Sequence, residues 1–150
     1  VMEYRIVPMA AHHVPAIAAL ETQCFSDPWS ESAIAPELQN PLSLWLAAEA
    51  LDGTLLGYVG SQRVPPEADM MNIAVAPAAR RQGIAEALVQ ALIRALDARG
   101  VTSLTLEVRV SNLPARTLYE KLGFAAVGLR KNYYFHPKED ACILRKDWNA

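Results

Sequence analysis

Residues 70–100 read MMNIAVAPAARRQGIAEALVQALIRALDARG, and this stretch decides the fold class. The apolar run from residue 70 to residue 76 ends at Pro77 and predicts a β-strand that is buried on both faces. From residue 82 to residue 99 the apolar side chains recur every four residues, which predicts a helix, and Gly100 follows as the left-handed residue that ends it. The stretch therefore predicts the first half of a β-α-β crossover.

The segments on either side predict the rest of a mixed sheet. An Asp52-Gly53 pair marks a hairpin between two strands, and Ser30 can cap a short helix that Pro36 bends. We expect strands at residues 4–9, 44–50, 55–64, 101–110, 124–131 and 140–146, and further helices at 11–25 and 113–122. The expected fold class is α/β (α+β), with a mixed, mostly antiparallel central sheet and helices on both faces. A right-handed crossover places the strands on either side of the long helix next to each other, with their carboxyl ends at one edge, where we expect ligand chemistry.

Composition limits the classes of protein and of partner. A chain of 150 residues is near the size of one domain, and we expect a single domain over residues 2–150. A formal net charge of −2 argues against broad electrostatic binding to nucleic acid or to an anionic membrane. Cys24 and Cys142 form no CxxC motif, and no apolar stretch reaches the roughly 20 residues of a membrane span, so a reduced cytoplasm is the expected location.

The turn between the strand and the long helix has the features of a phosphate site. The first turn of a helix has unpaired backbone N–H groups and about half a positive charge, and Gly83 allows a ligand to approach closely. Arg80 and Arg81 add local positive charge, although a solvated basic loop is the alternative interpretation. The turn is neither a Walker loop nor a GxGxxG fingerprint, which disfavours nucleoside triphosphates and dinucleotides.

The motif NIAVAP at residues 72–77, followed by RRQGIA at residues 80–85, resembles the GNAT family of N-acetyltransferases. The resemblance implies acetyl-coenzyme A as cosubstrate. The turn would hold the pyrophosphate through Arg81, Gln82, Gly83, Ile84, Ala85 and Glu86, and the strand would offer its backbone to the pantetheine arm at Ile73, Ala74 and Val75. The family often has Gly where this chain has Ala85; both residues are small, so we expect binding to survive.

Further segments resemble the RimI branch of this family, which acetylates ribosomal proteins at their N-termini. These segments are residues 106–112, 118–124, 132–134 and 139–141. By resemblance Glu107 is the proton acceptor, Tyr119 is the proton donor to the departing thiolate, and Asn112 contacts the cofactor. The alternatives are a surface pair of Glu107 with Arg109 or Arg130, a packing role for Tyr119 and a helix cap at Asn112.

The chemistry of the acceptor favours a peptide N-terminus. An α-amine with a pKa of ~7.7–8.0 is roughly 10–20% neutral at pH 7, whereas lysine is only about 0.04% neutral, a difference of roughly 3.5 kcal/mol. Glu107, as an ordinary carboxylate acting through a water molecule, suffices for such an amine. In RimI-like enzymes aromatic segments border the acceptor groove, which here would be Trp29, Tyr133 and Tyr134, although these side chains could equally be packing residues.

The sequence thus predicts a RimI-like N-α-acetyltransferase that transfers the acetyl group directly to a ribosomal protein. The rivals are the same chemistry on lysine or a small amine, and a coenzyme A-binding module without catalysis, against which Glu107 and Tyr119 argue. A nucleic-acid binder is disfavoured by the net charge. We expect no metal, since no cluster of metal ligands is evident, and the oligomeric state stays open. We expect His12, His13 and His136 to be surface residues, with His136 the one candidate for the substrate mouth.

Overall fold

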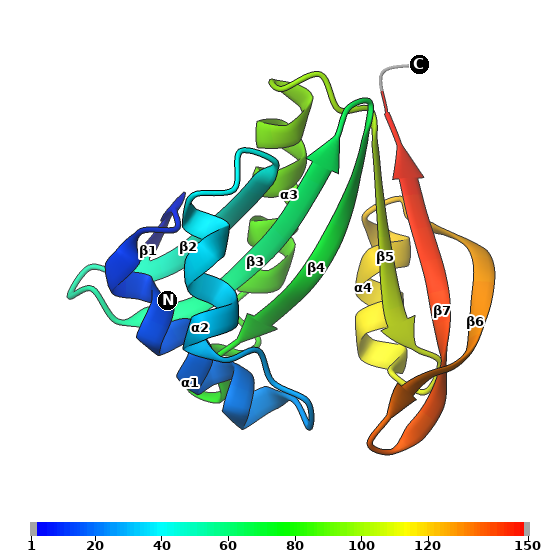
Figure 1. Cartoon of the computed structure of the whole chain (residues 1–150), viewed down its shortest axis with the longest axis horizontal. Helices are drawn as coiled ribbons and strands as arrows, with labels where there is room; N and C mark the ends of the chain where they lie inside the picture. The colour runs from blue at the N-terminus through cyan, green and yellow to red at the C-terminus, as the bar shows by residue number, and fades with distance from the viewer. Residues whose placement is uncertain (1–2, 149–150) are drawn as a thin grey trace.

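A seven-stranded sheet in the order β1-β2-β3-β4-β5-β7-β6 forms the centre of the computed structural model, which describes residues 3–148 (Figure 1). The strands are β1 (Tyr4–Pro8), β2 (Ser43–Ala50), β3 (Leu55–Val64), β4 (Glu67–Val75), β5 (Ser103–Arg109), β6 (Ala125–Phe135) and β7 (Lys138–Asp147). The α-helices are α1 (Val14–Cys24), α2 (Glu31–Ile34), α3 (Ile84–Asp97) and α4 (Leu113–Lys121), with short 3-10 helices η1 (Ala11–His13), η2 (Ala35–Leu38) and η3 (Pro77–Ala79). Every strand pair is antiparallel except β4 with β5.

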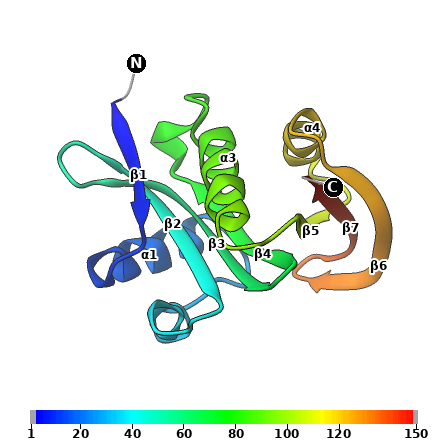
Figure 2. The same cartoon turned by 90° about the horizontal axis from the view of Figure 1, so that it is seen from above.

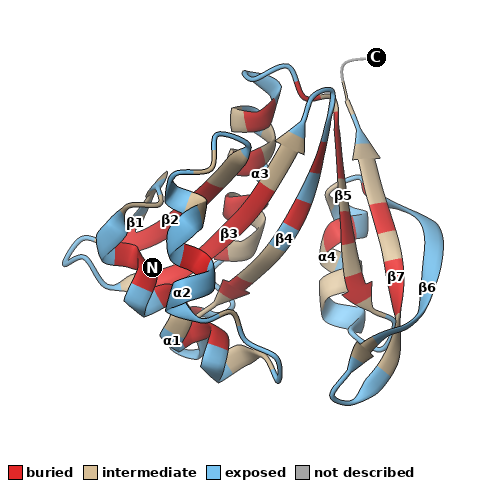
Figure 3. Ribbon diagram, in the orientation of Figure 1, coloured by how far each residue is buried: buried red, intermediate tan, exposed pale blue. Residues whose placement is uncertain are grey.

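The sheet has helices on both faces, as the sequence predicts. Helices α1 and α2 cover one face and α3 and α4 the other (Figure 2). Side chains alternate between two hydrophobic cores along β2: Trp45 packs beneath α1, and its neighbour Leu46 packs beneath α3. Strands β2 and β3 are therefore buried on both faces, whereas β6 at the edge is almost wholly exposed (Figure 3).

Helix α3 confirms the periodicity of its sequence. Its four-residue repeat of apolar side chains, from Ile84 to Leu96, is at most 1% exposed. The helix begins at residue 84 because Gly83 is its N-cap, with a left-handed φ of +74°. Gly100 has a φ of +82° just beyond its C-terminus, as expected. Ser30 caps α2 through Ala33 N–H, and the chain tightens into η2 at Ala35–Leu38, where Pro36 removes a helical donor.

Strand β4 corrects one prediction. It is not buried on both faces, because its burial alternates and Met71 is 37% exposed. The register shifts so that Gly60 faces Asn72 while Ser61 faces Met70, which leaves Met71 as the extra residue of a β-bulge. The apolar run in the sequence carries no sign of this bulge.

The crossover prediction is right that the strands on either side of α3 are parallel neighbours, but their pairing is short. Strands β4 and β5 pair in parallel over three residues only, from Glu67 opposite Ser103 to Asp69 opposite Thr105. Beyond this point they diverge, and α4 lies behind the opening (Figure 1). Their carboxyl ends share one edge of the sheet, as predicted, but the two strands are not paired there.

The last hairpin is longer than its sequence pattern indicates. Strand β6 continues past Lys131 to Phe135, and its pairing with β7 shifts between Arg130 and Tyr134. Asn132 adopts a left-handed φ of +54° at the shift, and its N–H group donates to Asp140 Oδ1 at 2.8 Å. This irregularity interrupts the alternation by which a strand is recognised in sequence.

The two cysteines are unpaired in the structure. Cys142 is buried in the core beneath α3, and Cys24 at the end of α1 is half-buried, 3.6 Å from Arg80 Nη2. Within residues 3–148, none of the helices has the length and apolar character needed to cross a membrane.

Gly60 lets the rigid Trp45 indole lie directly on the backbone of β3, and this generates a stability prediction. A Cβ at Gly60 would overlap the indole, which also stacks on Tyr58 with 5.9 Å between ring centroids and so cannot retreat. Gly60→Ala should lower the free energy of unfolding by about 1–3 kcal/mol in urea titrations. At the matched strand position Gly128, a Cβ meets only the flexible end of Ile143 at 3.3 Å, so Gly128→Ala should lose clearly less. Equal losses would contradict this account.

Candidate active site

The turn before α3 forms a concave cluster of backbone N–H groups. Arg81 and Gly83 both have left-handed φ angles, +66° and +74°, on either side of Gln82. Such a turn directs successive N–H groups to one side, where they join the free N–H groups of the first helical turn. Nothing lies within 4 Å of a Cβ built at Gly83, so the space in front of it is open to a ligand. The left-handed Arg81 was not predicted, because nothing in the sequence marks a non-glycine residue for that conformation.

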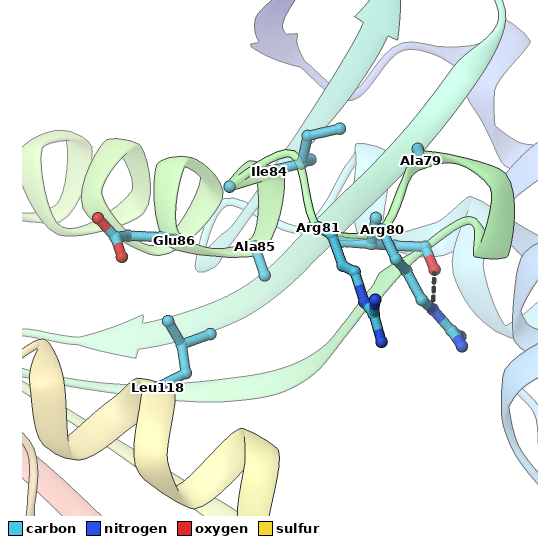
Figure 4. Close-up of a pocket in the computed structure, with 9 residues that line it drawn as sticks. Ala79, Arg80, Arg81, Ile84, Ala85, Glu86 and Leu118 are labelled. Carbon is cyan, nitrogen blue, oxygen red and sulfur yellow. Dashed lines mark hydrogen bonds between the residues drawn. The ribbon is translucent and has the colours of Figure 1, made fainter. Parts of the chain in front are cut away.

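A pocket of about 190 Å³ lies between this turn and α4. Its lining is Val75, Ala79, Arg80, Arg81, Gly83, Ile84, Ala85, Glu86 and Leu118. Arg80 and Arg81 point to the same side of the turn, and Arg80 Nε donates to Val75 O at 3.3 Å (Figure 4). Six of the predicted cofactor residues therefore share one pocket: Val75, Arg81, Gly83, Ile84, Ala85 and Glu86.

The remaining predicted cofactor residues do not line this pocket; one of them, Gln82, lies in the turn between the two left-handed residues. Ile73 and Ala74 belong to β4, and the Ala74 side chain is buried in the core beneath α1, so only its backbone can serve a ligand. Asn112 caps α4, since its Oδ1 accepts from Ala115 N–H at 3.2 Å, while its side-chain amide group remains a donor. Glu86 would repel a phosphate, but Lys121 pairs with it at 2.8 Å.

Tyr119 lies in the opening between β4 and β5. Its side chain is 5% exposed, packs edge-on against Phe124, and directs its hydroxyl to Met70 Sδ at 3.9 Å. A thioether sulfur is a weak acceptor, so the hydroxyl has no strong partner at this position. Burial raises the pKa of Tyr119 well above its ordinary value, so the phenol stays protonated through the neutral range.

Glu107 lies on β5 and pairs with Arg130, one of the two arginines that the sequence offers as its surface partner. Its Oε1 accepts from Arg130 Nε at 3.1 Å, and its side chain is 21% exposed. Arg130 is more than half exposed, and a pair of this kind contributes about 0–1 kcal/mol, so opening it is inexpensive. Burial, and after it the charge of Glu107, raises the pKa of Tyr133. Burial raises the pKa of Tyr134 to about 12.

Two loops from opposite sides of the opening meet at its mouth. Ser26 Oγ donates to the carbonyl oxygen of His136, and the Asp27 carboxylate pairs with His136 Nδ1 at 2.9 Å. Arg109 fastens the second loop by donating to Pro137 O at 2.8 Å, while its guanidinium lies 4.3 Å from the centre of the Tyr134 ring. His136 is thus an exposed residue at the meeting point of the loops.

The predicted acceptor residues divide into two groups. Tyr133 and Tyr134 contact each other edge-on, with 5.0 Å between ring centroids, near Glu107. Trp29 instead packs edge-on against Trp45 at 5.5 Å, in the core beneath α1, so its ring is anchored by packing. Tertiary packing of this kind is invisible in the local sequence.

His13 is a correction to the expectation that all three histidines are surface residues. It is 2% exposed, its Nδ1 accepts from Ala10 N–H at 2.9 Å, and its Nε2 donates to Glu49 Oε2 at 2.8 Å. Arg5 holds the other carboxylate oxygen of Glu49 at 3.0 Å, and His12 lies 3.7 Å from the pair. These residues have the spacing of metal ligands, but both ring nitrogens of His13 are already committed to hydrogen bonds. The cluster therefore reads as a polar link between β1 and β2.

Sequence reasoning missed Glu21, which is 1% exposed on the inner face of α1. Its carboxylate accepts hydrogen bonds from Trp29, Tyr58 and Asn72. The sequence does contain a sign that Glu21 is buried. It lies one helical turn after the buried Ile17, at a position where the helical period predicts an apolar residue.

Three comparisons agree on what this arrangement is. A sequence profile described as Acetyltransferase (GNAT) family matches residues 14–124. The ribosomal protein bS18-alanine N-acetyltransferase of Escherichia coli is 40% identical over 134 residues, which cover 87% of this chain and 88% of the relative. The enzyme of the same name from Salmonella typhimurium is 39% identical over 134 residues, with the same coverage of 87% and 88%. The crystal structure of the ribosomal-protein-S18-alanine N-acetyltransferase from Escherichia coli superposes with a TM-score of 0.90 at 36% identity, covering 99% of this chain and 96% of that chain.

The fold is that of an enzyme that transfers an acetyl group to nitrogen. The chain belongs to the acetyltransferase (GNAT) family, whose acetyl donor is acetyl-coenzyme A. The open, concave turn at residues 81–83 fits the pyrophosphate of that cosubstrate.

The two ends of α3 offer a matched test of the phosphate turn. Gly83 and Gly100 both have a positive φ, and a Cβ at either position meets nothing within 4 Å. Alanine at each should therefore lower the free energy of unfolding by a similar amount, about 1 kcal/mol or more, through backbone strain alone. Only Gly83→Ala should weaken coenzyme A binding in calorimetry, because only its Cβ enters the space in front of the helix N-terminus. Equal affinity for coenzyme A in the two variants would contradict the assignment of the phosphate to this turn.

Proposed function

We propose that this protein is an acetyl-coenzyme A-dependent N-α-acetyltransferase whose acceptor is the N-terminal amine of a ribosomal protein. The observation that carries the proposal is the identity of 39–40% with two bS18-alanine N-acetyltransferases, along nearly the whole of both chains. The same region contains a phosphate turn, a buried phenol and a carboxylate around one opening of the sheet. On this proposal residues 2–150 form one acetyltransferase domain that works in the cytoplasm; residue 2 and residues 149–150 lie outside the described residues.

The cofactor segment acts through its backbone. The N–H groups of Arg81 to Glu86 bind the pyrophosphate, and Arg81 adds a positive charge in a protein of net charge −2. The residues of β4 from Ile73 to Val75 offer main-chain groups to the pantetheine arm, because β4 has left β5 at this point. Asn112 donates its amide to the cofactor while its oxygen caps α4.

Two residues carry out the two proton transfers of the reaction. The neutral amine forms a C–N bond with the thioester carbonyl carbon, and the C–S bond breaks. Glu107, through a water molecule, takes the proton that the amine loses, and the hydroxyl of Tyr119 donates to the departing thiolate. No covalent enzyme intermediate is needed. Tyr133 and Tyr134, beside Glu107, and Trp29 line the acceptor's path on this proposal.

Lysine or small-amine acetylation is the rival within the same chemistry. It requires an amine that is several hundredfold less available in neutral form at pH 7. A carboxylate base provides no compensation for that deficit. A coenzyme A-binding module without catalysis is the other rival, and the presence of both Glu107 and Tyr119 disfavours it.

Tyr119→Phe tests the proton donor while keeping the shape of the core. The hydroxyl has only Met70 Sδ as a partner, so its loss should change the melting temperature little. The kcat should fall by about 10²–10⁴-fold, and the affinity for acetyl-coenzyme A should stay within a few-fold. Tyr4→Phe is the matched control, because Tyr4 of β1 packs against the same core but is assigned to neither substrate. A loss below threefold in Tyr119→Phe would assign the residue to packing alone.

The choice of amine and its pH dependence test the acceptor. A peptide that begins with a free Ala should be acetylated faster than the same peptide blocked at its N-terminus and carrying one free lysine, by much of the roughly 3.5 kcal/mol ionisation difference at pH 7. Between pH 7 and pH 9 the preference should narrow, because the α-amine soon becomes mostly neutral whereas the neutral lysine fraction rises about tenfold per unit. Mass spectrometry of both products measures the ratio.

Glu107→Gln tests the proposed base in the same peptide assay. It should slow the reaction most at low pH, where a base is needed, and least where the amine is already neutral. Glu67→Gln is the matched control, since Glu67 is also a strand carboxylate paired with an arginine, Arg145, at 3.2 Å. Equal or faster acetylation of the blocked peptide at pH 7 would overturn the N-α assignment.

A further inference from the structure

Glu21 is a buried carboxylate that gathers donors from three separate elements. Its Oε1 accepts from the backbone N–H of Trp29 at 2.9 Å, in the loop between α1 and α2. Its Oε2 accepts from the hydroxyl of Tyr58 on β3 and from Nδ2 of Asn72 on β4, the latter at 2.6 Å. One side chain of α1 therefore fastens a loop and two neighbouring strands to one another.

The elements that Glu21 joins are the ones to which the two substrates are assigned. The loop 25–30 carries Trp29 and, through Ser26 and Asp27, reaches His136 at the mouth of the opening. Asn72 follows the bulged residue of β4 and directly precedes the cofactor segment 73–75. Its Oδ1 accepts from the N–H of Ile73 at 3.1 Å, so the orientation of the Asn72 amide is fixed from both ends.

A packing role would not require a carboxylate at this position. Among the residues that the structure describes, no Lys, Arg or His pairs with Glu21, and burial raises its pKa although Trp29 and Asn72 lower it. A raised pKa means that Glu21 adds most to stability below its ordinary pKa and loses that contribution as the pH rises. At neutral pH a carboxylate is thus a poorer packing residue than a neutral side chain. What it offers instead is acceptor capacity for several donors at once.

We propose that Glu21 is a positioning residue: it sets the place of the acceptor loop 25–30 relative to the cofactor strand, and so controls how tightly the acceptor is held. This inference rests on the proposed function, which assigns the loop to the acceptor and β4 to acetyl-coenzyme A. Glu21 itself contacts neither substrate, because it is 1% exposed.

Glutamine cannot replace Glu21 in this network. Whichever way its amide turns, an N–H group faces either the N–H of Trp29 or the NH₂ group of Asn72. The Asn72 amide cannot turn to relieve the conflict without losing its bond to Ile73 N–H. A buried donor without an acceptor is costly, so the loop or the strand must shift. Exchanging the partners restores the match: in Glu21→Gln with Asn72→Asp, the new amide donates to the new carboxylate, which still accepts from Ile73.

This swap of the carboxylate and the amide between positions 21 and 72 is the basis of the kinetic experiment. Glu21→Gln should raise the KM for an Ala-initiated acceptor peptide about tenfold, with kcat and the Kd for acetyl-coenzyme A within threefold. The double variant Glu21→Gln, Asn72→Asp should return KM to within threefold of the parent. Asn72→Asp alone brings two carboxylates together, and the comparison does not depend on its folding. Glu37→Gln is the matched control, because Glu37 also accepts from three side chains, Ser43, Trp45 and Gln62, yet touches neither loop 25–30 nor the cofactor segment; its KM should not change.

A second measurement separates this inference from the proposed function. Amide hydrogen exchange in peptides that cover residues 25–30 should be faster in Glu21→Gln and return toward the parent rate in the double variant. If the parent protein acetylates no peptide N-terminus, the proposed function fails, while the exchange rates still judge the coupling. Three results would each overturn the positioning role. The first is an unchanged KM and an unchanged hydrogen-exchange rate in Glu21→Gln, and the second is a double variant as impaired as the single one. The third is a loss of acetyl-coenzyme A affinity in Glu21→Gln as large as its loss of acceptor affinity.

Discussion

The short pairing of β4 with β5 is the constraint on which the rest of the structure depends. After three paired residues the strands separate, and the backbone groups that a sheet would normally pair inside itself face an opening instead. Such a break is tolerable only where the strands are held firmly from elsewhere. Here β4 keeps its long ladder with β3 and rests on α3, while β5 keeps its ladder with β7. The proposed function places its phosphate turn, its buried phenol and its carboxylate around this one interruption.

Local electrostatics in the site is organised by the backbone more than by side chains. The pocket contains two arginines and one glutamate, and Lys121 pairs with that glutamate. Left-handed residues at 81 and 83 favour a turn whose N–H groups supply positive potential without an excess of basic residues, so the proposed anion site is compatible with a net charge of −2. Two further carboxylates, on β5 and β7, are paired with arginines: Glu107 with Arg130 and Glu139 with Arg109.

The local sequence pattern was enough to predict most helices and strands. The features that it could not predict depend on contacts between residues far apart in the sequence. The stripe of α3, the glycines at its two ends and the cap at Ser30 follow from neighbours within a few residues in sequence. The bulge at Met71 depends on the register with β3, and the burial of His13 depends on Glu49, 36 residues away. The three partners of Glu21 come from positions 8, 37 and 51 residues further along the chain. The roles of Glu107 and Tyr119 came from resemblance; the structure adds the arginine beside one and the weak sulfur partner of the other.

Gly83 begins the same helix whose side chains fill the core, and this links occupancy of the site to the folding equilibrium. A ligand on the turn binds the native chain and has no counterpart in the unfolded one, where the N–H groups are not directed together. Mass action then adds RT ln(1 + [L]/Kd) to the stability, about 2.7 kcal/mol at a hundredfold excess over Kd. On the proposed function, the acetyl donor therefore raises the thermal stability of the enzyme, and a thermal melt with increasing ligand reports affinity without any assay of the reaction.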